Sequence, residues 1–437
     1  MKVLKFGGTS VGSAQRMKEV SQLILNGEKN LVVLSAMSGT TNTLVEISDY
    51  LYKKNTDGAN ETINKLELKY ARVVEELYST DEYKAKTSDV LKSIFNYIRS
   101  FTKELFTLFE EKIILAQGEL MSTTMIHNYL LERGVKSELL PALDYMRTDK
   151  NSEPDLIYIR EKLNKMLEKH EEAEIFITQG YICRNAYGEI DNLQRGGSDY
   201  TASLIGAATL AEEIQIWTDI DGMHNNDPRY VEKTSPVRSL HFEEAAELAY
   251  FGAKILHPTC ILPAKLNNIP VRLLNTMEPE APGTLISNST EFGKIKAVAA
   301  KDGITAIKIK SGRMLLAYGF LRKVFEIFES YQTSIDMITT SEVGVSVTID
   351  NKKHLSEIVD DLKKFGTVTV DEDMVIICVV GDLEWENVGF EAKALNALKE
   401  IPVRMISYGG SNYNISFLIK ASDKKRALQL LSENLFN

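Results

Sequence analysis

The first part of the chain alternates short, continuously apolar segments with segments in which apolar residues recur every three or four positions. The apolar segments predict strands at Lys2–Phe6, Leu31–Ser35, Ile175–Tyr181, Ile214–Trp217 and Ile269–Leu274. The amphipathic segments predict helices over Ser13–Asn26 and from about Thr40 to Lys54. Strands that are apolar throughout and separated by helices are typical of a parallel sheet covered on both faces. We therefore expect an α/β domain with a mostly parallel sheet.

A long helical block interrupts this alternation between about residues 60 and 128. Its apolar residues follow helical spacing, as Val90, Ile94 and Ile98 illustrate. Such a stripe is typical of a helix that packs one face on a core. We interpret the block as a helical insertion that packs beside the sheet, in preference to a separate functional module.

Beyond a cluster of turn-forming residues at 279–293, the pattern of strands and helices occurs twice. The first copy predicts elements at 303–309, 319–331, 335–340, 344–349 and 354–365, and the second at 374–380, 389–399, 402–407, 414–420 and 423–435. Gly319-Phe320 corresponds to Gly389-Phe390, and residues 335–338 correspond to 403–406. Two βαββα(β) units in tandem are expected. The second copy ends on its helix, which leaves open whether the two units share or exchange a strand.

Composition and charge narrow the classes of function. Lys and Arg number 51 and Asp and Glu 61, a net charge of −10, which argues against nucleic acid or an anionic membrane as the main partner. No stretch approaches the length of a transmembrane helix, and the N-terminus lacks a signal peptide pattern, so a cytoplasmic protein is expected. Three scattered cysteines provide neither a disulfide framework nor a CxxC metal pair.

Candidate chemistry collects where the predicted strands end. Residues 5–12, KFGGTSVG, join the first strand to a helix, and exposed backbone N–H groups at such a junction bind phosphate. The run is neither a Walker loop nor a dinucleotide fingerprint. Comparable turns occur at residues 35–42, 194–201, 217–229 and 251–258. Ligands of open parallel sheets bind at the carboxyl ends of the strands, so these five turns are expected to form one site.

Four of these motifs, KFGGTSV, RGGSDYTA, WTD…DPR and FGAKILHP, together resemble the aspartate kinases of the amino-acid kinase fold. The resemblance covers nearly the whole chain, because that family also carries tandem ACT-type regulatory units. It implies ATP-dependent phosphorylation of the side-chain carboxylate of L-aspartate, the first step towards lysine, threonine and methionine. The implied domains are a kinase domain at 1–290, with the insertion at about 60–128, and ACT-type units at 303–371 and 374–437.

The resemblance assigns roles on the ATP side of the site. Phosphoryl transfer requires positioning and neutralisation of charge. Lys5 is expected to stabilise the transferring group, and Asp199 to position cationic groups or Mg²⁺, with Lys254 as a third catalytic residue. The expected ATP-binding residues are Lys5, Gly7, Gly8, Thr9, Thr218, Asp219, Arg229 and Lys254. His224 stands where the family has a tyrosine, so the nucleotide contact at that position stays unassigned.

On the amino-acid side, the resemblance assigns the α-carboxylate of aspartate to Arg195 and its α-ammonium to Glu119. The expected substrate-binding residues are Ser35, Thr41, Glu119, Arg195, Gly196, Gly197 and Ser198. No histidine falls at metal-ligand spacing, so no metal site made of protein side chains is predicted.

ACT-type units imply an amino-acid effector and a homodimer or homotetramer. The effector is expected to be lysine, with threonine as the alternative. Its site is expected at Met314, Gly319, Phe320, Leu321, Ile335, Asp336, Ser341 and Glu342. Asp336 and Glu342 are candidates to bind the ε-ammonium, and the backbone N–H groups at 319–321 are candidates to bind the carboxylate.

Two other functions stay open. Another amino-acid kinase fold enzyme would act on glutamate, acetylglutamate, carbamate or UMP. A non-catalytic amino-acid sensor would keep the repeat and lose catalysis, although the presence of Lys5, Asp199 and Lys254 argues against it.

Overall fold

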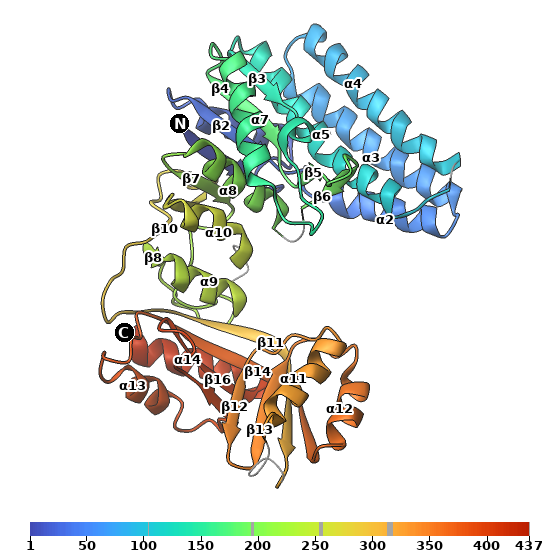
Figure 1. Cartoon of the computed structure of the whole chain (residues 1–437). Helices are drawn as coiled ribbons and strands as arrows, with labels where there is room; N and C mark the ends of the chain where they lie inside the picture. Colours follow the sequence, from blue (N-terminus) through green and yellow to red (C-terminus); the bar gives the residue numbers. More distant parts are fainter. Residues whose placement is uncertain (104, 194–195, 253–256, 313–317, 437) are drawn as a thin grey trace. The chain divides into compact units, whose positions relative to one another are not determined.

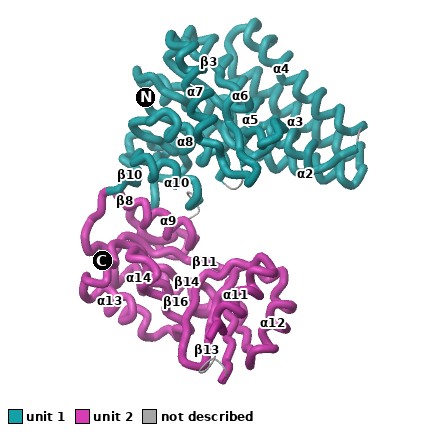
Figure 2. Tube along the Cα trace, in the orientation of Figure 1, with its two compact units in different colours: residues 1–223, 256–288 teal, residues 224–255, 289–437 magenta. Residues whose placement is uncertain are grey.

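The computed structural model describes residues 1–103, 105–193, 196–252, 257–312 and 318–436. The chain divides into two compact units, residues 1–223 with 256–288 and residues 224–255 with 289–437 (Figure 2).

The first unit is built on a mostly parallel sheet with strand order β3-β4-β2-β1-β7-β9-β10. Its strands are β1 (Lys2–Phe6), β2 (Asn30–Leu34), β3 (Ser137–Leu140), β4 (Ile175–Gln179), β7 (Ile214–Thr218), β9 (Val271–Asn275) and β10 (Thr284–Ser287). All neighbours pair in parallel except β10, which is antiparallel to β9. From β1 the chain adds strands first on the β2 side and later on the β7 side. Such a reversal of order places a ligand crevice at the carboxyl ends of the central strands.

Helices surround this sheet, and the predicted insertion forms a layer of long helices beside it (Figure 1). The helices of the first unit are α1 (Ala14–Ile24), α2 (Thr40–Tyr52), α3 (Thr56–Leu77), α4 (Asp81–Ser100), α5 (Leu108–Glu132), α6 (Ala142–Tyr145), α7 (Leu156–Lys169), α8 (Gly197–Thr209) and α10 (Pro258–Leu266), with a short hairpin of β5 (Ile182–Arg184) and β6 (Ile190–Asn192). One apolar cluster joins the sheet to α1–α5. None of the helices in the described ranges combines the length and the apolar character needed to cross a membrane.

The second unit contains a six-stranded antiparallel sheet of order β12-β13-β11-β14-β16-β15. Its strands are β11 (Ile295–Lys310), β12 (Ile338–Ser341), β13 (Gly344–Ile349), β14 (Thr367–Gly381), β15 (Met405–Ser407) and β16 (Asn414–Lys420). Its helices are α11 (Phe320–Ser330), α12 (Leu355–Lys363), α13 (Phe390–Ala397) and α14 (Lys424–Leu435), with β8 (Ser239–His241) and α9 (Phe242–Tyr250) from the earlier segment. The sheet and its helices form the two predicted repeats.

The two long strands, β11 and β14, show where the second repeat obtains its fourth strand. Residues 305–310 of β11 pair with β13 in the first copy, while residues 295–301 pair with 376–381 of β14, which itself pairs with β16. The second copy therefore takes its fourth strand from the segment that precedes the first copy, and β14 closes the first copy with residues 367–374. The register shifts between Lys301 and Ile304, where Gly303 adopts a positive φ of 75°. The repeats share two continuous strands.

Residues 224–255, which the sequence predicts as part of the kinase domain, group by their contacts with the second unit. Val231 belongs to the apolar core of the second repeat. Asn226 donates from Nδ2 to the carbonyl of Leu428 at 3.0 Å, and the ammonium of Lys424 lies 4.4 Å from the centre of the Tyr230 ring. These contacts are long-range in sequence, so no local pattern indicates them.

Candidate active site

The loop after β1 and the loop after β2 lie against each other through their backbones. Ser38 N–H donates to the carbonyl of Gly8 at 3.0 Å, and a side chain at position 8 would place its Cβ 2.8 Å from the carbonyl oxygen of Ala36. Only glycine permits this approach. The predicted phosphate loop and the predicted substrate loop therefore form one rigid rim at the carboxyl edge of the sheet.

Lys5 and Asp199, 194 positions apart, form an ion pair beside this rim, with 2.6 Å between Nζ and Oδ1. Lys5 is 8% exposed and lies on β1, and its Nζ is 3.6 Å from the position that a Cβ of residue 7 would occupy. Asp199 lies in the first turn of α8, where the helix dipole favours a carboxylate. Gly196 caps this helix with a φ of 74°. Fold topology thus brings together the two residues that the motifs assigned to phosphoryl transfer.

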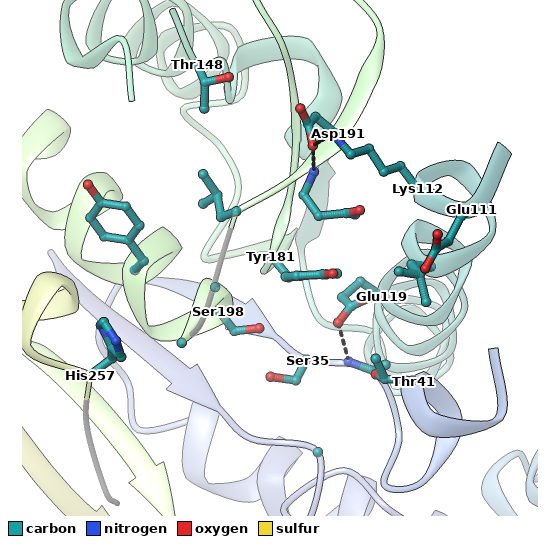
Figure 3. A pocket seen from close by; sticks show the side chains of 18 of the residues that line it. Ser35, Thr41, Glu111, Lys112, Glu119, Thr148, Tyr181, Asp191, Ser198 and His257 are labelled. Carbon is teal, nitrogen blue, oxygen red and sulfur yellow. Dashed lines mark hydrogen bonds and ion pairs between the residues drawn. The ribbon is translucent and has the colours of Figure 1, made fainter. Parts of the chain in front are cut away.

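A cavity of about 1050 Å³ opens next to the rim within the first unit (Figure 3). Its walls come from the β2–α2 loop, from α5, from the β5–β6 hairpin, from the start of α8 and from residues 148–154. Of the predicted residues, the cavity is lined by Gly8, Ser35, Thr41, Glu119, Gly196, Gly197 and Ser198. Ligand pockets have about 300–1,000 Å³. The cavity can hold a small substrate together with part of a second ligand.

Glu119 is the most unusual group in this cavity. It is 3% exposed, its Oε1 accepts a hydrogen bond from Ala36 N–H at 3.2 Å, and its Oε2 has no hydrogen-bond partner in the described chain. Burial raises the pKa of Glu119 to about 8, against the opposing effect of the Ala36 N–H. A buried carboxylate oxygen without a partner is costly, so the geometry favours a cationic ligand at this position.

The cavity also contains residues that the sequence motifs did not indicate. Lys112 on α5 pairs with Asp191 on the hairpin at 2.7 Å, and Figure 3 shows this pair at the edge of the cavity. Tyr181 lines the cavity as well, and burial raises its pKa to about 12. Tyr181 ends a predicted apolar strand and could have been found by the same strand-end argument. Lys112 could not have been found in this way, because it lies within the predicted helical block, where a lysine usually indicates a solvent-exposed position.

The other predicted nucleotide residues that the structure describes are divided between the two units. Thr218 ends β7, and its Oγ1 accepts from Ile220 N–H at 3.3 Å, forming the turn that contains Asp219. Thr9 follows the glycine pair of the phosphate loop. Arg229 belongs to the second unit, where its guanidinium contacts both oxygens of Asp227. The ring of His224 also lies in the second unit, 2.8 Å from Thr234 Oγ1. Arg195 and Lys254 lie outside the described residues.

The described chain contains no cluster of three or more His, Cys, Asp or Glu side chains suited to a metal ion. A magnesium ion that arrives on nucleotide phosphates needs only one or two carboxylates from the protein, and Asp199 offers one.

In the second unit, Asp336 occupies a buried ion-pair cluster. Its side chain is 1% exposed, and its Oδ1 lies 2.6 Å from Lys301 Nζ and accepts from Tyr250 OH at 2.6 Å. Lys301 also pairs with Asp350 at 3.0 Å and lies 4.2 Å from the centre of the Tyr250 ring. Burial opposes the charge of Lys301, but the hydrogen bond that Lys301 donates to Asp336 contributes to a pKa that is raised overall. Asp336 Oδ2 has no hydrogen-bond partner in the described chain.

The other predicted effector residues lie around two element ends. Gly319 caps α11 with a φ of 81° and no side-chain hydrogen bond, and Phe320 and Leu321 begin that helix. Strand β12 begins at Ile338, later than predicted, so Ile335 and Asp336 precede it, while Ser341 is its last residue and Glu342 follows it, exposed. Met314 lies outside the described residues. Lys301 and Tyr250 were missed because both are far from this segment in sequence.

Models of two protein families match this chain. The amino acid kinase family model matches residues 1–275, and an ACT domain model matches residues 377–435. Aspartokinase 1, a chloroplastic protein of Arabidopsis thaliana, is 36% identical over 99% of this chain and 80% of its own length. This chain belongs to the aspartokinase family. The lysine-sensitive aspartokinase 3 of Escherichia coli K12 is another similar aspartokinase, 32% identical over 99% of both chains.

A solved aspartokinase structure extends the likeness to the fold. Aspartokinase III of Escherichia coli in complex with aspartate and ADP aligns over 100% of both chains with a TM-score of 0.85 and 32% identity. The predicted resemblance and the predicted fold class, a kinase fold followed by ACT-type units, are confirmed. An aspartokinase is a phosphotransferase, which agrees with the reaction class that the family resemblance implied.

Proposed function

We propose that this chain transfers the γ-phosphoryl group of ATP to the side-chain carboxylate of L-aspartate. The observation that carries the proposal is the cavity of the first unit. It presents a buried carboxylate with one oxygen free, Glu119, next to glycine loops and the Lys5–Asp199 ion pair. Membership of the aspartokinase family supports the same reaction.

Aspartate binds through the two groups that do not react. Its α-ammonium completes the hydrogen bonding of Glu119 Oε2, and its α-carboxylate is assigned to Arg195. Ser35, Thr41 and the Gly196–Ser198 segment line the remaining surface of the substrate. An ammonium on Glu119 directs the other end of the amino acid away from α5.

The reacting carboxylate is already ionised at neutral pH, so no general base is needed. One of its oxygens attacks the γ-phosphorus, the bond between that phosphorus and the β–γ bridging oxygen breaks, and ADP leaves with the bonding electrons. The barrier therefore comes from bringing anions together, which positioned cations lower. Lys5 stabilises the transferring group, Asp199 holds the Lys5 ammonium in place, and Lys254 is assigned to the same region.

The nucleotide is held by Gly7, Gly8 and Thr9, together with Thr218, Asp219, Arg229 and Lys254. Mg²⁺ bound to the phosphates would neutralise part of their charge, with Asp199 as the available carboxylate. The kinase domain is assigned to 1–290 and the two ACT-type units to 303–371 and 374–437. The role of His224 is left without an assignment.

The second unit is proposed to bind a regulatory amino acid and to form a homodimer or homotetramer. A lysine-sensitive relative supports lysine as the effector. Asp336 Oδ2 and the exposed Glu342 are the acceptors proposed for its ε-ammonium, and the start of α11 is the donor proposed for its carboxylate.

An acceptor screen tests the proposal. Purified protein is given ATP, Mg²⁺ and one acceptor at a time from L-aspartate, L-glutamate, N-acetylglutamate, carbamate and UMP, and ADP release is measured. Release with aspartate alone, reduced by millimolar lysine, is expected. Turnover with another acceptor would indicate a different amino-acid kinase, and absence of turnover with every acceptor would indicate a sensor. Inhibition by threonine and not lysine would overturn only the effector.

A further inference from the structure

The segment between β2 and the first turn of α2, residues 35–41, begins and ends with the predicted substrate residues Ser35 and Thr41 and is held by two helices of the insertion. We refer to it as the acceptor loop. Helix α5 binds its start, since Ser122 Oγ donates to the carbonyl of Ser35 at 2.8 Å and Glu119 accepts from Ala36 N–H at 3.2 Å. Gly118 lets this helix approach, because a Cβ there would lie 2.8 Å from the Ala36 side chain.

Helix α3 binds the end of the same loop through two successive residues. Lys69 Nζ donates to the carbonyl of Ser38 at 2.8 Å, and Tyr70 OH lies 3.0 Å from Thr40 Oγ1. Tyr70 is fully buried and packs edge-on against Phe95, with 5.9 Å between ring centres. Tyr70 is thus fixed by the core of the insertion, while Lys69 reaches the loop from the surface of the helix.

Ser38 connects Lys69 to the phosphate loop. Its carbonyl accepts from Lys69, and its N–H donates to the carbonyl of Gly8 at 3.0 Å. A Cβ at Gly12 would lie 3.2 Å from Ser38 Cβ, so the two loops are in close contact on that side as well. A displacement of Ser38 therefore changes the distance between the acceptor loop and the phosphate loop.

We propose that Lys69 and Tyr70 are positioning residues for phosphoryl transfer, and that the helical insertion sets the distance between acceptor and donor. This inference rests on the proposed function. The proposed Lys5 and Glu119 contacts hold the two ligands, but the geometry between them depends on the two loops. A misplacement of about 1 Å can cost about 10²-fold in rate. The insertion thus has a catalytic purpose beyond covering the sheet.

The test compares Lys69→Met and Tyr70→Phe with the matched control Lys65→Met, one turn earlier on α3. Lys65 pairs with Glu61 at the surface, and its side chain is 72% exposed. Lys69→Met is expected to lower kcat about tenfold, with the KM for aspartate and ATP within about twofold of wild type. Tyr70→Phe keeps the ring in the core and is expected to lower kcat in the same way. Lys69→Arg should recover most of the lost rate.

Unchanged kcat in Lys69→Met, or a change confined to the KM for aspartate, would overturn the proposal, as would an equal loss in Lys65→Met. Hydrogen exchange provides a readout that does not require turnover. Backbone amides of residues 36–40 are expected to exchange faster in Lys69→Met than in wild type and in Lys65→Met. Equal exchange in the three proteins would overturn the positioning role. A wild-type enzyme without aspartate turnover, with the exchange difference present, would overturn the proposed function instead.

Discussion

Two buried carboxylates, one in each unit, differ in what the protein provides for them. Glu119 and Asp336 each have one oxygen with partners and one without. The partner of Glu119 is a neutral backbone N–H, whereas Asp336 contacts the ammonium of Lys301 and the hydroxyl of Tyr250. Both residues were predicted to bind the ammonium of an amino acid. In the described part of the chain, an ammonium that binds Glu119 meets no other positive charge, whereas one that binds Asp336 meets the ammonium of Lys301.

At Glu119, a ligand provides the first positive charge, so the carboxyl must lose its proton when the ligand binds. Its raised pKa also affects stability. Relative to an ordinary glutamate, Glu119 lowers the free energy of unfolding progressively as pH rises from about 4.5 to about 8.

At Asp336, a positive charge is already present, so the effector must either join the ammonium of Lys301 or displace it. On the proposed assignments, the substrate site accepts a charge that arrives with the ligand, whereas the effector site requires an exchange of charges.

The largest expected effect concerns the Lys5–Asp199 pair, which resembles the Lys301–Asp336 pair in its 2.6 Å distance. If Lys5 stabilises the transition state, Lys5→Ala should lower kcat by roughly 10²–10³ and change the KM for aspartate much less. Steady-state kinetics with ADP detection measures this. Near-normal kcat would exclude a catalytic role for Lys5. The Lys5–Asp199 pair would then be a structural ion pair, like that of Lys301 and Asp336.

Glu119→Gln should raise the KM for aspartate by about 30-fold, corresponding to roughly 2 kcal/mol for a charge left unpaired in the site. The contact exists in the ground state and in the transition state, so kcat should change little. A rise in the KM for ATP, with aspartate unaffected, would mean that the two subsites are assigned the wrong way round.

Asp336→Asn should raise the lysine concentration for half inhibition by about tenfold, within the usual range of allosteric coupling. Glu342→Ala should act in the same direction. Uninhibited kcat is expected to stay near that of wild type, because neither residue belongs to the first unit. Dose–response curves at fixed substrate measure the shift. Unaltered lysine sensitivity in both variants would place the effector elsewhere.

The smallest effect is expected in the second repeat, where Arg404 stands at the position that corresponds to Asp336. Arg404 pairs with Asp371 at 2.9 Å, so the charges are inverted relative to the first repeat. A lysine ammonium would meet the like charge of Arg404 there, and the carboxylate of Asp371 is already paired. Arg404→Met should therefore change the half-inhibiting lysine concentration by less than about twofold, as for an exposed ion pair. A shift as large as that of Asp336→Asn would remove the distinction between the repeats.

The sequence predicted well what depends on local pattern. The strand Lys2–Phe6 and the strands Gly344–Ile349 and Asn414–Lys420 were predicted to the residue, because apolar runs between turn residues define them. The clustering of the glycine loops followed from the rule that ligands bind at strand ends. Glu119 came from family resemblance, and its position in the cavity agrees with that assignment.

The sequence could not predict contacts between segments that are distant along the chain. Nothing near Asp336 indicates Lys301 or Tyr250, and nothing in the insertion indicates that Lys69 reaches Ser38. The exchange of strands between the repeats was also open, because residues 295–301 lie outside both predicted copies. Strand β11 belongs to both repeats, and its first half therefore reads in the sequence as part of the boundary before the first repeat.

Proton release on aspartate binding tests the central claim most directly. A carboxyl of pKa about 8 is about nine-tenths protonated at pH 7, so an ammonium that binds Glu119 should displace close to one proton. Calorimetric titration of aspartate at pH 7, in two buffers of different ionisation enthalpy, measures this number. We expect release of most of one proton by wild type and almost none by Glu119→Gln. Binding of aspartate without proton release in the wild type would contradict it.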